Sequence, residues 1–429
     1  MAEATAARRR NVLAVNDTVL AHQRRWFAEL RRRVADGEPY ALLSADAPHE
    51  IYRAMGIPYV VVQWWSSLIA AKQQAPAALA ALGAAGLPDD VEPYNSLGLG
   101  MQLLGDTVEQ PWGGLPPPAV IQCALSGDGA RKLYERWAAE IGATFFPLER
   151  SVEVRLEVPA RWWEELPHHW DEVLDEARLD VFAAQLEGLA AALGRLTGRR
   201  LSSDDLEAVL ELANAQAECN RSTRDLIARS VPAPVGAADT MTATMVPQWH
   251  RGSREGLALA RAFHDEVAGR VAAGEAACAG ERVRMMWLGR GLWSSLGLYQ
   301  RFEHDRQAVF VWSMYLGLAA DGYLRYVDGR DPLRALAARF VPMGDELRMP
   351  AWSAPWHLEE ARRHGIDGVV SLGEDDWFST ELLAGEGIPV LSIDADNVDR
   401  RTWNEDELFE RIGRFVDEQA LPAAARRRG

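Results

Sequence analysis

Short apolar runs alternate with amphipathic stretches along the first third of the chain. The opening stretch to about Asp36 carries apolar residues at helical spacing, and a second helix is predicted over Asp128–Ile141. Tyr59–Val62 is apolar on both faces, as in a strand buried inside a parallel sheet. The other apolar runs are Tyr40–Ser44, Ala119–Cys123 and Thr144–Pro147. Strands that alternate with helices predict a doubly wound parallel sheet.

The middle of the chain has a helical pattern, and the last third returns to alternation. Apolar residues recur at helical spacing over 167–198, Ser202 begins a second helix, and a third is predicted over Glu255–Ala273. The later strands are predicted at Arg282–Leu288, Ala308–Val311, Gly368–Ser371 and Pro389–Ile393. We therefore predict an α/β protein with two doubly wound parallel-sheet halves, of the Rossmann or flavodoxin type, and a helical insert between them. The predicted domains are residues 1–165, 166–280 and 281–429.

Composition and charge exclude several classes of protein. The 429 residues include 46 basic and 62 acidic side chains, and the resulting net charge of −16 argues against a nucleic-acid-binding protein. No apolar run reaches the ~20 residues that span a bilayer. No signal peptide is visible, so we expect a cytoplasmic protein. The three cysteines lie far apart, which excludes a disulfide framework and a zinc ribbon.

Tryptophan is unusually frequent, with 16 residues against 9 tyrosines and 11 phenylalanines. In open parallel sheets, ligands bind beyond the carboxyl ends of the strands, and several tryptophans and serines follow predicted strands. These candidate substrate-binding residues are Trp64, Trp65, Ser66, Trp293, Trp312 and Ser313. They indicate either a ligand pocket or large side chains that cap the sheets and fill the core.

An acidic cluster, Glu374–Asp376, follows the predicted strand Gly368–Ser371. Carboxylates in such a cluster can hold a hard divalent cation. An equally good interpretation is a solvated loop whose acidic residues stabilise the start of the next helix. Gly289 and Gly291 lack the third glycine of a dinucleotide-binding loop, so the sequence gives little support to that cofactor.

The stretch Ser44–Pro58 reads Ser-Ala-Asp-Ala-Pro-His-Glu-Ile-Tyr-Arg-Ala-Met-Gly-Ile-Pro. It resembles the opening signature of the 2-hydroxyacyl-CoA dehydratase D-component family, which includes the B- and C-type subunits of benzoyl-CoA reductase. Here the glycine and proline of that signature are one residue closer together. Further similar stretches follow in the same order: Tyr94–Ser96, Cys123 with Arg131–Leu133, Phe182–Leu212, Ile366–Val370 and Gly387–Leu391.

The resemblance implies a pair of related subunits that act on a coenzyme A thioester. Each subunit of the family typically holds a [4Fe–4S] cluster by three cysteines, and a separate ATP-dependent activator protein injects one electron. Leu97–Leu99 and Glu374–Trp377 stand where two of these cysteines are expected. The resemblance therefore implies Cys123 as the single sulfur ligand, to which Asp375 could be added.

We predict a subunit of a 2-hydroxyacyl-CoA dehydratase-like or acyl-CoA reductase-like complex, acting on a bulky or aromatic acyl group. A related partner subunit would carry the cluster. His49 and Glu50, at a helix start beside the first strand, are predicted to assist proton transfer, although Glu50 also fits a helix-dipole partner. One alternative is a cluster-less scaffold or ligand-binding subunit. Another is a non-radical enzyme that uses Cys123 as a nucleophile or an acidic metal site.

Overall fold

Two four-stranded parallel sheets form the framework of the chain. The computed structural model describes residues 12–125, 127–151, 153, 159–343, 352–373 and 377–428. Sheet A has the order β2 (Tyr59–Val61), β1 (Ala41–Leu43), β3 (Val120–Ala124), β4 (Thr144–Leu148). Sheet B has the order β6 (Ala308–Ser313), β5 (Val283–Leu288), β7 (Gly368–Leu372), β8 (Val390–Ile393). All the paired strands are parallel, which confirms the predicted α/β class with two parallel-sheet halves.

Six helices belong to the same part of the chain as sheet A. They are α1 (Val15–Ala35), α2 (His49–Ala54), α3 (Val62–Ala71), α4 (Ala75–Ala84), α5 (Pro93–Leu104) and α6 (Asp128–Ile141), with short 3₁₀ turns at Gly105–Thr107 and Pro111–Gly113. Helices α3 and α6 pack against the strands of sheet A. Helix α3 begins directly at the end of β2, so the residues that follow that strand are helical. Trp64, Trp65 and Ser66 therefore lie on α3, and the geometry of that helix sets where their side chains point.

Five further helices cover the middle of the chain: α7 (Trp162–Val173), α8 (Glu176–Thr197), α9 (Ser203–Arg229), α10 (Ala237–Trp249) and α11 (Arg254–Ala273). The side chains of Asp175, Ser202 and Ser253 accept backbone N–H groups at the starts of α8, α9 and α11, which is why these helices begin there. Helix α9 packs along α11 and also touches α2, α14 and α15. Helix α9 therefore packs against helices of both the N-terminal and the C-terminal half.

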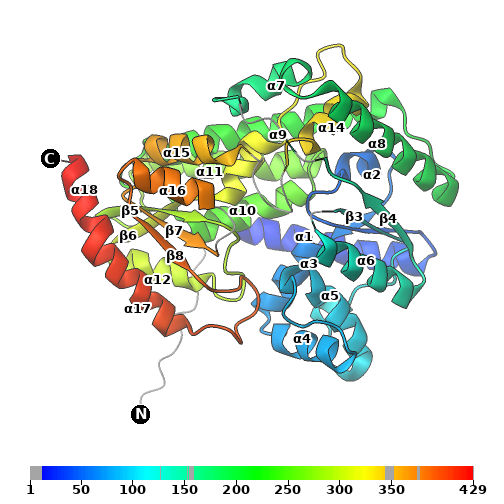
Figure 1. Cartoon of the computed structure of the whole chain (residues 1–429), viewed down its shortest axis with the longest axis horizontal. Coiled ribbons are helices and arrows are strands. Elements are labelled where there is room, and N and C mark those ends of the chain that lie inside the picture. Colours follow the sequence, from blue (N-terminus) through cyan, green and yellow to red (C-terminus); the bar gives the residue numbers. More distant parts are fainter. Residues whose placement is uncertain are drawn as a thin grey trace.

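The last part of the chain surrounds sheet B. Its helices are α12 (Gly297–Asp305), α13 (Met314–Gly317), α14 (Pro332–Phe340), α15 (Ser353–His364), α16 (Trp377–Gly385), α17 (Glu405–Phe415) and α18 (Leu421–Arg428), with π-helical segments at Leu318–Gly322 and Val416–Ala420. Figure 1 shows sheet B with α15–α18 on one side of the molecule and sheet A with α3–α6 on the other. Helix α14 lies apart from sheet B and packs against α8 and α9. The domain boundaries given above stay predictions. Within the described ranges, no helix is long and apolar enough to cross a membrane.

Candidate functional site

The loops that follow the strands of sheet B carry several buried polar atoms. Ser294 follows β5, Ser313 ends β6, and Asn397 follows β8. The Oγ atoms of both serines and the Nδ2 of Asn397 are buried, and none has a hydrogen-bond partner in the described part of the chain. Buried polar groups in native proteins are nearly always satisfied by protein, water or ligand. We call Ser294, Ser313 and Asn397 the strand-end cluster.

The β5 loop, which contains Ser294, lies where the two halves of the chain meet. The backbone N–H of Trp293 donates to the carbonyl oxygen of Asn397 at 2.9 Å, which holds the β5 and β8 loops together. Gln73, directly after α3, donates from Nε2 to the carbonyl oxygen of Ser294 at 2.9 Å. The guanidinium of Arg290 lies 5.6 Å from the ring centroid of Tyr94 on α5. The predicted binding residue Trp293 therefore lies beyond the carboxyl end of β5, next to the contact of Ser294 with the N-terminal half, and Ser313 ends β6.

The predicted binding residues on α3 have different surroundings. Trp64 lies 5.1 Å, ring centroid to ring centroid, from Trp26 on α1, and Trp65 lies 5.5 Å from Phe27. Both side chains are at least 96% buried, in an aromatic core between α1 and α3. The hydroxyl of Ser66 is buried, and no partner for it is found among the described residues. Their assignment to a substrate site stays a prediction.

Glu50 lies at the centre of a buried ion-pair cluster. Its Oε1 accepts hydrogen bonds from Arg251 Nε and from Arg339 Nη1, each at 2.7 Å. All three side chains are almost completely buried. Burial by itself raises the pKa of Glu50, but the two guanidinium groups outweigh it and the net shift is downward. Glu50 is therefore held as a carboxylate where α2 meets α9, α14 and the turn between α10 and α11.

Cationic charge is in excess around Glu50. Arg339 Nη2 donates to Oδ1 of Asn214 on α9 at 2.8 Å, and the backbone N–H of Arg325 donates to the same atom at 3.2 Å. Burial lowers the pKa of Arg325 to about 9, so it stays charged at neutral pH. Among the described residues, Glu50 is the carboxylate that forms ion pairs with Arg251 and Arg339, while Asp321 acts on Arg325. We call Glu50, Arg251, Arg325 and Arg339 the arginine–glutamate cluster.

His49 is buried one residue before Glu50. Its Nε2 donates to the carbonyl oxygen of Ser44 at 3.1 Å, while its Nδ1 is buried without a partner among the described residues. Burial, followed by the charge of Arg251, lowers the pKa of His49 well below 6.5. The imidazole is therefore neutral at physiological pH. Nothing measured on the structure tests the predicted proton transfer by His49 and Glu50.

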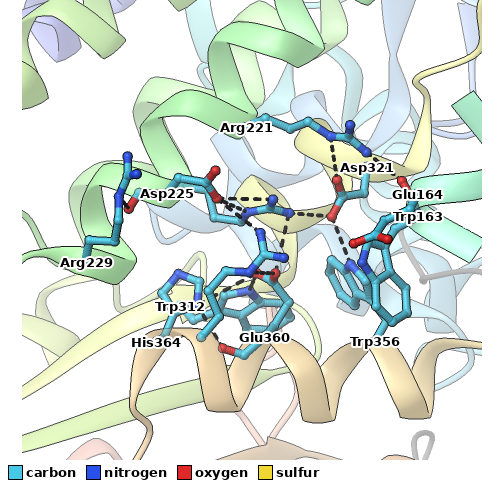
Figure 2. A network of polar contacts seen from close by, with 12 residues as sticks. Trp163, Glu164, Arg221, Asp225, Arg229, Trp312, Asp321, Trp356, Glu360 and His364 are labelled. Carbon is cyan, nitrogen blue, oxygen red and sulfur yellow. Dashed lines mark hydrogen bonds and ion pairs between the residues drawn. The ribbon is translucent and has the colours of Figure 1, made fainter. Parts of the chain in front are cut away.

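Trp312 is part of a second buried polar network. Figure 2 shows Trp312, Trp356, Asp321 and Glu360 gathered where β6 and α15 meet α9. The indole N–H of Trp312 donates to Glu360 Oε2 and that of Trp356 donates to Asp321 Oδ2, each at 2.9 Å. Arg224 on α9 hydrogen-bonds Asp321 and lies 3.5 Å from Glu360 Oε1. Burial raises the pKa of Glu360 to about 7, with Asp321 adding to the shift and Arg224 opposing it.

This network occupies the polar edge of Trp312. Its indole nitrogen already has a carboxylate partner, and its ring packs 5.5 Å from that of Trp356. Trp312 therefore helps to pack α15 against β6. Ser313, the next residue, is the one whose side chain has an unpartnered donor.

The described residues do not form a cluster-binding site. No group of three or more His, Cys, Asp or Glu side chains that could hold a metal ion occurs among them. Cys123 is buried on β3, and Asp375 lies outside the described residues. Leu97–Leu99, where a first cysteine is expected from the resemblance, lie buried on α5. A Cβ at Gly98 would come within 2.3 Å of the Trp137 ring, so that ring fills the adjoining space.

Apart from Glu50 and Trp312, the residues of the two buried networks were not predicted from the sequence. Arg251 lies in the turn between α10 and α11, and Arg339, Asp321 and Glu360 lie in helical segments where no motif distinguishes them from exposed charged residues. Arg339 is 289 positions from Glu50 in the chain. The one available signal was weak: charged residues in helices expected to be buried need partners.

Comparisons with known proteins cover most of the chain. Residues 44–418 match the family described as 2-hydroxyglutaryl-CoA dehydratase, D-component. The chain is similar to the (R)-phenyllactyl-CoA dehydratase alpha subunit of Clostridium sporogenes, with 20% identity over 382 residues, which is 88% of each chain.

Proposed function

Because the chain belongs to the 2-hydroxyglutaryl-CoA dehydratase D-component family, we propose that it is one subunit of an enzyme complex that removes water from a 2-hydroxyacyl-CoA thioester. The observation that carries this proposal is the family match over residues 44–418, which includes every strand of the two parallel sheets except β1 (Ala41–Leu43). Reduction of an aromatic acyl-CoA is the second candidate, since the resemblance also extends to benzoyl-CoA reductase subunits.

We propose a bulky or aromatic acyl group as the substrate portion that this chain contacts. The relative from Clostridium sporogenes is named for phenyllactyl-CoA. Trp293 is 7% exposed at the meeting of the two halves, and its ring lies 5.3 Å from that of Tyr315. Aromatic side chains offer large apolar contact area to a planar ring. Ser294, Ser313 and Asn397 would supply hydrogen bonds to the polar part of the thioester.

We propose that the redox group belongs to a related partner subunit. A [4Fe–4S] cluster needs several thiolates, and the described residues bring only Cys123 to the place that the resemblance assigns to a ligand. The proposal therefore gives this chain substrate binding and orientation. It leaves electron transfer to the partner and to an ATP-dependent activator.

Anaerobic purification of the tagged chain from its own cells, alone and with the proteins that accompany it, tests this division of roles. We expect iron and acid-labile sulfide in the complex, far less than one cluster in the separated chain, and loss of water from an aryl 2-hydroxyacyl-CoA by the complex. A stoichiometric cluster in the separated chain would refute the division. Turnover by an iron-free complex would refute the dehydratase proposal in its radical form.

The Cys123→Ala variant separates the alternatives. We expect the complex to keep its activity and iron content with this substitution, since the partner holds the cluster. Iron-independent activity of the chain alone, abolished by Cys123→Ala, would instead indicate a nucleophilic enzyme. His49→Gln and Glu50→Gln, measured as kcat and KM over a pH series, test the predicted proton transfer.

A further inference from the structure

A cavity of about 240 Å³ lies between α1, α2 and the start of β2. Its walls include Trp26 and Leu30 on α1, Arg53 on α2, the entry of β2 from Gly56 to Tyr59, and His250. Tyr59 is the first residue of β2, so the cavity lies at the amino end of that strand. The strand-end cluster lies beyond carboxyl ends of strands, and the cavity is therefore distinct from it.

Among the charged residues that line the cavity, Arg53 forms no ion pair with a described carboxylate. Glu29 is bound by Arg32 through two hydrogen bonds of 2.9 and 2.7 Å, and Arg33 donates to Glu38 at 2.6 Å. Arg53 has no ion pair with any residue that the structure describes. Its Nη2 donates to the Tyr59 hydroxyl at 3.0 Å, and its Nε is buried with no partner there. An unpaired guanidinium in a partly enclosed space favours an anionic ligand.

The other walls are flat and apolar. The ring of Trp26 lies 4.6 Å from that of His250, and the Arg53 guanidinium lies 5.3 Å from the ring centroid of Tyr59. Burial lowers the pKa of His250 well below 6.5, so this wall is uncharged at neutral pH. Leu30 adds aliphatic surface. The volume is below the ~300–1,000 Å³ of sites for drug-sized molecules, which limits the ligand to a compact one.

We propose that this cavity binds a compact aromatic carboxylate, with the carboxylate on Arg53 and the ring against Trp26 and Tyr59. The planar guanidinium matches a carboxylate in two hydrogen bonds, and no carboxylate of the described residues pairs with Arg53 and competes for that place. The proposal does not depend on the dehydratase function. Arg53 is one helical turn from Glu50 and His250 precedes Arg251, so a ligand here would contact residues directly joined to the arginine–glutamate cluster.

Isothermal titration calorimetry of the full chain with benzoate tests the proposal, with benzyl alcohol and inorganic phosphate as probes that lack the charge and the ring. We expect one benzoate per chain, and at least about tenfold weaker binding of the two other probes. Arg53→Gln should weaken benzoate binding at least about tenfold, and Arg53→Lys should weaken it less. Arg136→Gln, which removes an arginine from the exposed surface of α6, is the matched control and should leave the affinity unchanged.

Three results would overturn the proposal. The first is no heat of binding from the wild-type chain at millimolar benzoate. The second is equal affinity of the wild type and Arg53→Gln, with circular dichroism showing that the variant is folded. The third is phosphate binding as tight as that of benzoate, which would indicate a simple anion site without an aromatic wall. Should Arg53→Gln fail to fold, Trp26→Ala gives the independent test, because it removes the ring contact and keeps the cation.

Discussion

Glu50 is the charge on which the arginine–glutamate cluster depends, and we predict that Glu50→Gln lowers the free energy of unfolding by about 3–5 kcal/mol. Two guanidinium groups contact the carboxylate at 2.7 Å. With an effective dielectric constant of about 20 and charges ~4 Å apart, each pair contributes about 4 kcal/mol of attraction. Desolvation of the carboxylate offsets several kcal/mol of that sum. The amide keeps the shape of the side chain, so the loss is electrostatic.

Urea denaturation followed by tryptophan fluorescence and circular dichroism measures this change. Glu29→Gln is the control, because Glu29 pairs with an arginine on the exposed surface of α1 and should leave the midpoint unchanged. Adding Arg339→Met to Glu50→Gln should recover part of the loss, since it removes one of the uncompensated cations. A Glu50→Gln chain that unfolds at the wild-type urea concentration would refute the reasoning.

The pH dependence gives a second measure of the same ion pairs. The pKa of Glu50 is lower in the folded chain than its ordinary value of 4.5, so its contribution is fully present above pH 4.5 and is lost as the pH falls through the folded pKa. The stability difference between the wild type and Glu50→Gln should therefore be constant from pH 7 to pH 5 and shrink below pH 4.5. A difference that grows with acidity would contradict the assigned ion pairs.

Further variants test packing, a buried carboxyl and a helix cap. Gly98→Ala should lower the free energy of unfolding by about 1–3 kcal/mol, because the new Cβ meets the Trp137 ring. Gly188→Ala, in the open middle of α8, should instead raise it by about 0.5–1 kcal/mol. Thermal melts of the two variants measure the difference. Burial and then Asp239 raise the pKa of Glu303 to about 8, so the wild type should lose a few kcal/mol of stability as the pH rises from 4.5 to 8. Glu303→Gln should remove this loss, which denaturation measured over the same pH range would show. Asp175→Ala should lower stability by about 1 kcal/mol in the same assay, because it removes the side-chain acceptor at the start of α8.

The strands and the class of fold follow from local patterns, and several helices do not. Most strands are short apolar runs buried on both faces, and that signal needs no knowledge of neighbours. The edge strands β4 and β8 are only partly buried. Helix α3 begins without a side-chain cap at the end of β2, so no residue marks the change from strand to helix. Helix α10 has no side-chain cap and contains Pro247, which removes the usual sequence signals at its start and within it.

The candidate site was predictable only as far as its position on the sheets. The rule that ligands bind beyond strand ends indicated Trp293 and Ser313, and the structure places Trp293 beside the contact between the halves and Ser313 at the end of β6. The same rule indicated Trp64 and Trp65, which pack against α1 because β2 continues directly into a helix. Whether a side chain is buried, and what it contacts, depends on elements hundreds of residues away. The arginine–glutamate cluster is the clearest case, because Glu50 and Arg339 are 289 positions apart.

The filled space around α5 and the charged interior at α2 suggest how this chain differs from what its resemblance implies. Where a cluster ligand is expected, α5 presents Leu97–Leu99 and receives the Trp137 ring against Gly98. A cysteine at position 98 would meet the Trp137 ring, so a thiolate at that position would need a smaller residue at 137 as well. The ion pairs of Glu50 join the N-terminal half to the central helices without using that region. The ion pairs of Glu50 therefore do not depend on whether α5 carries a cluster ligand, which is consistent with the proposal that a partner subunit holds the redox group.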